Sequence, residues 1–201
     1  MKVRNLLLLV FISLSIHSFA QNKPDLAKKI EQLAKKVVPY IHTEDVFLNT
    51  GRSLIATEDY NNVKKIVMSN GFPTINMVGK ENSHKFWMLV QLCDFDIQMQ
   101  LAVLKQMSRL VRKGEVIQED FAMLTDRTRM NRGVAQLYGT QYVLDHDGVV
   151  MLFQIHDMNN VNDRRKSLGL SKLEQSPKPV IDTMTKKGVE ETKYDDEPRS
   201  N

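Results

Sequence analysis

Apolar residues recur at helical spacing along most of this chain, and this period constrains the fold more than any other feature. Leu26, Ile30 and Leu33 fall on one face of a helix that begins near Asp25. Pro39 limits or kinks this helix, because a proline inside a helix removes a hydrogen bond and clashes with the preceding turn. The folded part of the chain is therefore predicted to begin with an amphipathic helix.

Four more helices are predicted before residue 132. Thr57 is a good N-cap for the first of them, and Asn70-Gly71 offers it a left-handed stop. Phe72-Pro73-Thr74 is predicted to be a loop. The next helix is apolar nearly all round, which predicts the buried centre of the domain, and Asp96 caps the helix after it. The predicted ranges are 57–70, 81–94, 97–112 and 118–131.

The period changes towards the end of the folded part. Tyr142–Leu144 and Val149–Phe153 have the length and composition of strands, and the Asp147-Gly148 dipeptide between them is typical of a hairpin turn. A last helix is expected near 160–168, ending at Gly169. The sequence therefore predicts an α+β fold: a predominantly α-helical single domain with a small C-terminal β-hairpin.

The first twenty residues have the layout of a cleavable secretory signal. Lys2 and Arg4 precede an apolar run from Leu6 to Ile16, and Ser18-Phe19-Ala20 resembles a cleavage site. The run is shorter than the roughly 20 residues that a bilayer-spanning helix needs, which favours cleavage over a membrane anchor. No cysteine follows it for a lipid anchor. We therefore expect a signal peptide over 1–20 and a periplasmic or secreted protein without membrane attachment.

Charge and composition divide what remains. Cleavage would remove two basic residues and lower the formal net charge of +4 by two, and nucleic-acid binding would need a clustered basic face. From Ser176 the chain is rich in proline and charge, with Tyr194 as its only aromatic residue, and cannot bury enough apolar surface to order itself. We expect a folded domain over 22–175, a disordered charged tail over 176–201, and no nucleic-acid partner.

The sequence gives little sign of a metal, a cofactor or a reactive thiol. Cys93, the single cysteine, lies in an apolar run without a nearby histidine or cation, which favours a buried hydrophobe over a nucleophile. The histidines show no metal-ligand spacing, and no phosphate loop, dinucleotide fingerprint or Gly-x-Ser-x-Gly elbow is present. Asp145, Asp147 and Gly148 lack the distal acid of a calcium loop. No metal or cofactor is expected.

Polar residues on the central helix are the first candidate site. His84, Trp87, Gln91 and Asp94 form one stripe at helical spacing. Burying Gln91 and Asp94 without partners would cost about 1–3 kcal/mol each or more. They are therefore either a hydrogen-bonded pair in the core or the wall of a pocket.

Two further candidates follow along the chain. Asp126 and Arg127 point about 100° apart on a helix, so each needs its own partner, and the planar fork of Arg127 suits Asp94 or an anionic ligand. A structural ion pair and a ligand site both fit. The segment Gln136-Leu137-Tyr138-Gly139-Thr140-Gln141 offers neutral donors and acceptors in a loop, and Gly139 allows a turn or a close backbone approach.

Several of these residues occur together with others in an order and spacing that resemble a bacterial domain-of-unknown-function family, number 6624. The resemblance covers about residues 45–175, and the Tyr-Gly-Thr-Gln segment and its distance from Asp-Arg are its most specific elements. Its motifs are Gly71-Phe72-Pro73-Thr74, Val78-Gly79, Trp87 with Val90-Gln91, Asp94 with Asp96 and Gln100, Asp126-Arg127, Gln136-x-Tyr138-Gly139-Thr140-Gln141, and Asp163-Arg164-Arg165 with Leu168-Gly169-Leu170.

The resemblance implies a helical domain and no particular activity. One position departs from it, because relatives often carry Gln-His-Ala-Asp where this chain has Gln91-Leu92-Cys93-Asp94. If the family histidine is a general base or a metal ligand, Leu92 cannot replace it.

Three functions fit these residues. The first is a module outside the cytoplasm that binds an unknown small polar ligand or partner. The second is a metal-independent hydrolase in which Asp94 is the acid or base and Arg127 stabilises negative charge. The third is a structural or partner-binding protein that makes contact through its tail. The expected ligand-binding residues are Trp87, Gln91, Asp94, Arg127, Gln136, Tyr138, Thr140 and Gln141.

Overall fold

The computed structural model describes residues 23–37, 55–144 and 146–173. The expected signal peptide, Pro39, Asp145 and the expected charged tail lie outside the described residues.

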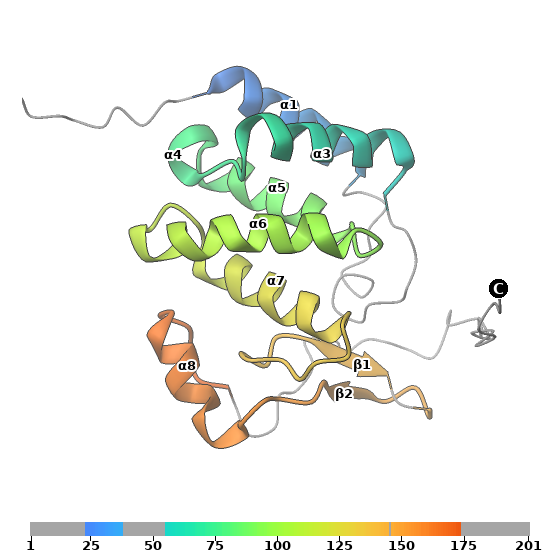
Figure 1. Cartoon of the computed structure of the whole chain (residues 1–201), viewed down its shortest axis with the longest axis vertical. Helices are drawn as coiled ribbons and strands as arrows, with labels where there is room; N and C mark the ends of the chain where they lie inside the picture. Colours follow the sequence, from blue (N-terminus) through green and yellow to red (C-terminus); the bar gives the residue numbers. More distant parts are fainter. Residues whose placement is uncertain (1–22, 38–54, 145, 174–201) are drawn as a thin grey trace, which may run out of the picture.

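The helices stack in layers, with α5 in the middle (Figure 1). Helix α5 packs against α1, α3, α4 and α7, and α6 packs against α7. Phe86, Leu89 and Val90 of α5 are completely buried, because this helix carries apolar side chains on several faces. The prediction that this helix forms the centre of the domain is confirmed. The bounds are α1 Pro24–Val37, α3 Thr57–Asn70, α4 Ile75–Val78, α5 Lys80–Gln91, α6 Ile97–Leu110 and α7 Gln118–Met130.

Side chains fix where the helices begin and end. An Asp96 oxygen accepts a hydrogen bond from the backbone N–H of Met99 at 3.0 Å, which confirms this residue as the cap of α6. Tyr60 of α3 donates its hydroxyl to the same carboxylate at 2.6 Å and so ties α3 to α6. Helix α3 ends at Gly71, whose φ of 70° favours glycine.

Two local predictions need correction. Thr57 is not the N-cap of α3: Ala56 takes that position without a side-chain cap, and Thr57 is the first helical residue. The central helix ends at Gln91 rather than at residue 94, so Asp94 lies in the turn that follows. The predicted loop Phe72-Pro73-Thr74 is confirmed, and the short helix α4, which was not predicted, follows it; Thr74 Oγ1 accepts from Met77 N at 3.3 Å.

Helix α6 is also shorter than its predicted range. It ends at Leu110, and the 3₁₀ turn η2 (Val111–Lys113) follows it. Gly114, with φ of 69° in the left-handed region, then terminates this turn.

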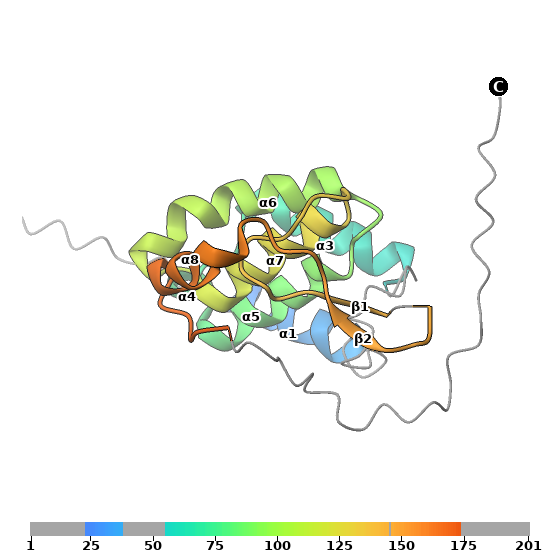
Figure 2. The ribbon, with the colours of Figure 1, turned by 90° about the horizontal axis from the view of Figure 1, so that it is seen from below.

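The C-terminal part forms the expected hairpin and short helix. Strands β1 (Tyr142–Leu144) and β2 (Val150–Leu152) pair antiparallel, with Tyr142 opposite Leu152. The 3₁₀ turn η3 (Met158–Asn160) leads into helix α8 (Val161–Ser167). Figure 2 shows the hairpin and α8 on the side of α7 that faces the viewer. The fold is a predominantly helical α+β domain, as predicted.

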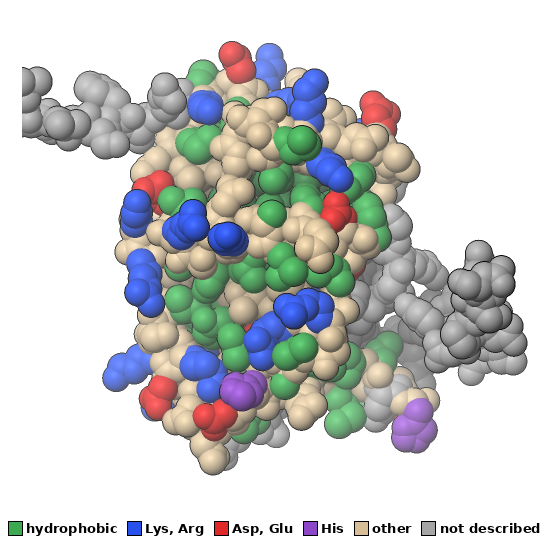
Figure 3. Space-filling model, in the orientation of Figure 1, with side chains coloured by type: hydrophobic (Ala, Val, Ile, Leu, Met, Phe, Trp, Pro, Cys, Tyr) green, Lys and Arg blue, Asp and Glu red, His purple; other side chains and the backbone are tan. Residues whose placement is uncertain are grey.

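On the face shown in Figure 3, Lys and Arg side chains are interspersed with acidic and apolar ones. None of the helices in the described ranges is both long and apolar enough to cross a membrane.

Candidate functional site

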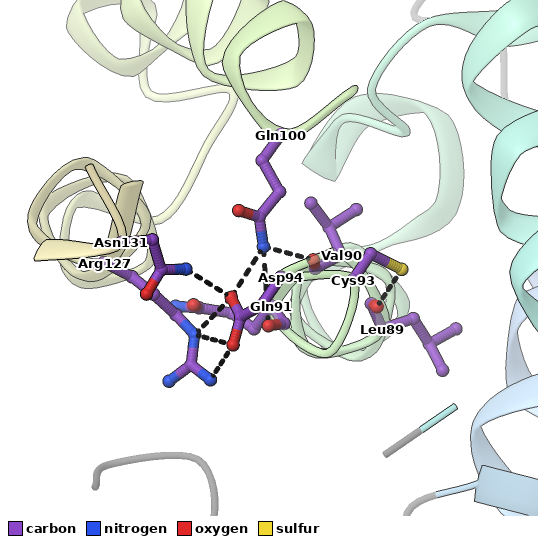
Figure 4. A network of polar contacts seen from close by, with 8 residues as sticks. All are labelled: Leu89, Val90, Gln91, Cys93, Asp94, Gln100, Arg127 and Asn131. Carbon is purple, nitrogen blue, oxygen red and sulfur yellow. Dashed lines mark hydrogen bonds and ion pairs between the residues drawn. The ribbon is translucent and has the colours of Figure 1, made fainter. Parts of the chain in front are cut away.

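A buried ion pair joins the turn after α5 to α7. Arg127 Nε donates to both oxygens of Asp94, at 2.9 and 3.1 Å, and Arg127 Nη2 donates to Oδ2 as well (Figure 4). The Arg127 side chain is 2% exposed, whereas that of Asp94 is 22% exposed. The partner that the sequence suggested for Arg127 is therefore present, in the fork geometry that favours arginine over lysine.

Two further donors hold the same carboxylate, and neither was among the predicted site residues. Asn131 Nδ2 lies 2.7 Å from Asp94 Oδ1, and Gln100 Nε2 lies 3.1 Å from it. Gln100 also donates to the backbone oxygen of Val90 at 3.0 Å. Asn131 stands four residues after Arg127, on the same side of α7, and this spacing was the available signal. Together these donors hold the Asp94 carboxylate in one orientation.

Two other residues of the predicted stripe, Gln91 and Trp87, are buried but lack side-chain hydrogen-bond partners among the described residues. Gln91 and Trp87 are 1% and 3% exposed. Among the described residues, neither polar atom of the Gln91 amide nor the indole Nε1 of Trp87 has a hydrogen-bond partner, and Gln100 Oε1 has none either. Figure 4 shows the Gln91 side chain beside those of Asp94 and Arg127. Each such atom costs about 1–3 kcal/mol unless something outside these residues satisfies it.

The stripe has a second carboxylate at its other end. His84 Nδ1 of α5 lies 2.9 Å from Asp120 Oδ1 of α7. The His84–Asp120 pair therefore joins α5 and α7 near one end, and the Asp94–Arg127 pair joins them near the other. Trp87 and Gln91 lie between these pairs. We call this set the α5–α7 seam, which comprises His84, Trp87, Gln91, Asp94, Asp120, Arg127 and Asn131.

The other four predicted site residues belong to a separate cluster. Asp126 accepts hydrogen bonds from the backbone N–H groups of Leu137 at 2.7 Å and Thr140 at 3.0 Å, and from Thr140 Oγ1 at 2.9 Å. Tyr138 N donates to it as well, at 3.1 Å. Burial raises the pKa of Asp126, and the loop donors offset part of this rise. Asp126 therefore holds the loop in place.

Gln136 completes the framework of this loop. Its Oε1 accepts from the backbone N–H groups of Thr140 and Gln141, at 2.8 and 2.9 Å. Its Nε2 donates to the backbone oxygens of Gln141 and Phe153, at 3.0 and 2.7 Å. Gly139 allows the turn, with φ of 71° and side chains of Leu173 and Ile155 within 3.0 Å of where a Cβ would stand. The amide of Gln136 is thus fully used for structure.

The eight predicted residues therefore form two groups rather than one pocket. Trp87, Gln91, Asp94 and Arg127 lie in the seam. Gln136, Tyr138, Thr140 and Gln141 lie in the loop bound to Asp126, and Figure 1 places α7 between α5 and the β1–β2 hairpin that continues this loop. Burial raises the pKa of Tyr138, which is half-buried, and Gln141 Oε1 has no hydrogen-bond partner among the described residues.

The sequence of the chain matches one known protein family. The profile of a family of unknown function, DUF6624, matches residues 42–188. The chain belongs to this family. No curated protein and no solved structure matches the chain.

Within the DUF6624 match, position 92 carries no ionisable group. Leu92 caps the C-terminus of α5 and is 3% exposed, so it belongs to the core. Cys93 is completely buried, and burial raises the pKa of its thiol to about 12. Among the described residues, no group of three His, Cys, Asp or Glu side chains is placed to hold a metal ion.

Proposed function

We propose that this protein is exported from the cytoplasm and binds a small polar ligand at the α5–α7 seam. The observation that carries the proposal is the pair of buried residues, Trp87 and Gln91, whose polar atoms are unpartnered within the described residues. Four of the six unpartnered buried atoms in that part of the chain belong to Trp87, Gln91 and Gln100. Buried polar groups in proteins are nearly always hydrogen-bonded, so these exceptions call for a partner, and a bound molecule would supply one.

The chemistry of the seam suits a neutral or zwitterionic ligand with hydrogen-bonding groups. The Gln91 amide offers both a donor and an acceptor, Trp87 Nε1 is a donor, and Gln100 Oε1 is an acceptor. Asp94, with 22% of its side chain exposed, lies at the edge of this group and is oriented by Arg127. Such fixed polar groups in a mostly apolar surrounding orient small ligands.

The contacts of Asp94 and Arg127 support binding more than hydrolysis. An acid or base needs a carboxylate that exchanges its proton, but the oxygens of Asp94 accept from Arg127, Gln100 and Asn131. Arg127 is 1% exposed and directs its guanidinium at Asp94, so it is poorly placed to stabilise charge on a substrate. The pair positions the seam rather than carrying out chemistry.

Export rests on the sequence of residues 1–20. A positive start, an apolar run and a small-residue cleavage pattern support it. Expression of the chain with its own signal in bacteria, followed by fractionation and mass determination, tests this part. A mass that lacks residues 1–20 in the periplasmic or culture fraction is expected, and a full-length cytoplasmic protein would contradict export.

Trp87 provides a direct test of binding because it is the single tryptophan of the chain. Its emission is to be recorded while amino acids, sugars and nucleosides are added one at a time, with thermal unfolding measured in parallel. We expect at least one compound to shift the emission and raise the Tm. Gln91→Leu should abolish both responses.

Gln98→Leu is the matched control, since it makes the same change at an exposed position of α6. It should leave both responses intact. A response that survives in Gln91→Leu places the ligand elsewhere, and no response to any compound counts against a small polar ligand.

A further inference from the structure

His84 is held rigidly at the end of the seam away from Asp94. Its Nδ1 lies 2.9 Å from Asp120 Oδ1 and 3.1 Å from Oδ2. The Asp120 side chain is 3% exposed, whereas 45% of the His84 side chain is exposed. The ring also stacks on Trp87, with 5.1 Å between ring centroids and 20° between planes. Two independent contacts thus fix the plane of the imidazole.

A surface hollow of about 500 Å³ lies against this pair. The N-terminal parts of α5 and α7 form its walls, so two helices contribute to one concave surface. Its lining residues are Lys80, Glu81, His84, Ile117, Glu119 and Asp120.

We propose that the His84–Asp120 pair is a general-base site that hydrolyses small carboxylic esters held in this hollow. A carboxylate that accepts from Nδ1–H selects the tautomer in which Nε2 is a proton acceptor. Within the described residues, the hydrogen bonds of this ring involve Nδ1 alone, which leaves Nε2 for a bound molecule. This site lies at the other end of the seam and does not depend on a ligand at Gln91.

We assign water as the nucleophile in this step, since the lining residues within the described part of the chain include no Ser, Thr or Cys. His84 Nε2 takes a proton from water, and the electron pair of the broken O–H bond stays on oxygen, which attacks the carbonyl carbon of the ester. The tetrahedral intermediate collapses, the bond to the leaving oxygen breaks, and that oxygen takes the proton back from Nε2. Lys80 is the cation of the lining that can face the negative carbonyl oxygen.

The charges around the ring set the pH range of this reaction. The hydrogen bond to Asp120 raises the pKa of His84, while burial and Lys80 oppose this rise. Glu81 on α5 and Glu119 on α7 are the other charged groups that line the hollow. Activity is therefore expected to increase with pH as the imidazolium loses its proton, with a midpoint above the ordinary histidine value of 6.5.

The test follows release of 4-nitrophenolate from 4-nitrophenyl acetate by the purified protein between pH 5 and 9, against free imidazole at equal concentration. We expect the protein to be faster than imidazole. His84→Asn should lower the rate at least about tenfold, since general bases contribute roughly 10²–10⁴-fold. His146→Asn is the matched control, because His146 forms a similar pair with Asp147 at 3.2 Å but is 87% exposed, and it should change nothing.

Asp120 is a positioning residue, and its test is the pH profile. Asp120→Asn should retain part of the rate and move the midpoint to lower pH, whereas a purely structural role would lower the rate without moving the midpoint. Circular dichroism shows whether each variant is folded. The proposal is overturned if His84→Asn remains as active as the wild type, or if the wild type is no faster than imidazole at any pH.

Cross-tests separate this inference from the proposed ligand site. Gln91→Leu should keep ester hydrolysis while it loses the Trp87 response to the small polar ligand. His84→Asn should lose hydrolysis and keep a ligand-dependent rise in Tm, because the polar atoms proposed to bind the ligand are those of Trp87, Gln91 and Gln100 and not those of His84. Loss of both functions in both variants would mean that the seam is a single site, which contradicts the separation argued above.

Discussion

A buried glutamine lies on each side of α7, and the two differ in whether their side-chain amides are hydrogen-bonded. Gln136, on the loop side, is 0% exposed, and four backbone groups pair with its amide. Gln91, on the seam side, is 1% exposed, and its amide has no partner within the described residues. Hydrogen bonding therefore separates the two residues, whereas burial does not. A buried amide with all its hydrogen bonds stabilises the fold, whereas a buried amide without them lowers the free energy of unfolding.

Two carboxylates show the same contrast. Asp126 lies in α7 and faces the loop, whereas Asp94 pairs with Arg127 on the seam side. Asp126 accepts from backbone N–H groups and a hydroxyl of one loop, so its partners are neutral. Asp94 is paired with the guanidinium of Arg127, which is itself buried. Removing Asp126 would free a loop, but removing Asp94 would take a carboxylate away from a buried guanidinium. The seam should therefore be the more sensitive of the two sides to loss of a charge.

The largest effect is expected from Asp94→Ala. The change takes the carboxylate away from a buried guanidinium, and the free energy of unfolding should fall by up to about 3–5 kcal/mol. Urea denaturation followed by Trp87 emission measures this change. The double variant Asp94→Ala with Arg127→Met should lose less than the sum of the two single variants, because it removes both members of the ion pair. Additive losses would show that the pair is not coupled.

Gln136→Leu should have the next largest effect. Leucine has a similar volume but takes the side-chain acceptor from Gln141 N–H and the side-chain donor from the backbone oxygen of Phe153, whereas Thr140 N–H keeps Asp126; each lost partner costs about 1–3 kcal/mol. We expect a loss of roughly 2–4 kcal/mol in the free energy of unfolding. Amide hydrogen exchange at Gln141 should accelerate more than at Thr140, whose N–H still donates to Asp126. Unchanged exchange there would mean that Asp126 alone holds the loop.

Gln91→Leu should act in the opposite direction. It removes two unpartnered polar atoms from the interior, so the free energy of unfolding without ligand should rise by about 1–2 kcal/mol. The same urea titration measures it. A loss of stability of the size expected for Gln136→Leu would show that the Gln91 amide is satisfied by a permanent structural partner, and the contrast between the two faces would disappear.

The sequence predicted the helices and the hairpin because these depend on local patterns. Periodicity located the long helices, Asp96 marked the start of α6, and Asp147-Gly148 marked the turn between the strands. Helix α4 was missed because four residues are too few to show a period. Thr57 was taken for a cap that Ala56 occupies, and boundaries within one residue are the least determined part of any helix.

Only one of the two groups of candidate site residues could be predicted from the sequence, because the contacts of the other depend on the tertiary fold. The pairing of Arg127 with Asp94 followed from the fork geometry of arginine and the need of each charge for a partner. The structural roles of Gln136 and Thr140 could not be predicted in this way. The Gln136 amide binds backbone groups and the Thr140 hydroxyl binds Asp126, and the tertiary fold brings these partners together. Asp120 was missed for the same reason: its partner His84 lies on another helix.

The smallest expected effect concerns the pH dependence of stability at the His84 end of the seam. The pKa of His84 is raised in the folded protein, so its pairing with Asp120 stabilises the fold fully below about pH 6.5 and is lost as the pH rises through the folded-state pKa. From pH 6 to pH 9 the wild type should therefore lose free energy of unfolding relative to His84→Asn. The ring is partly exposed and solvent-screened, which keeps the difference under about 1 kcal/mol. His146→Asn should parallel the wild type at every pH. Parallel curves for the wild type and His84→Asn would mean that Asp120 does not favour the imidazolium, which would weaken the argument that this end of the seam moves protons.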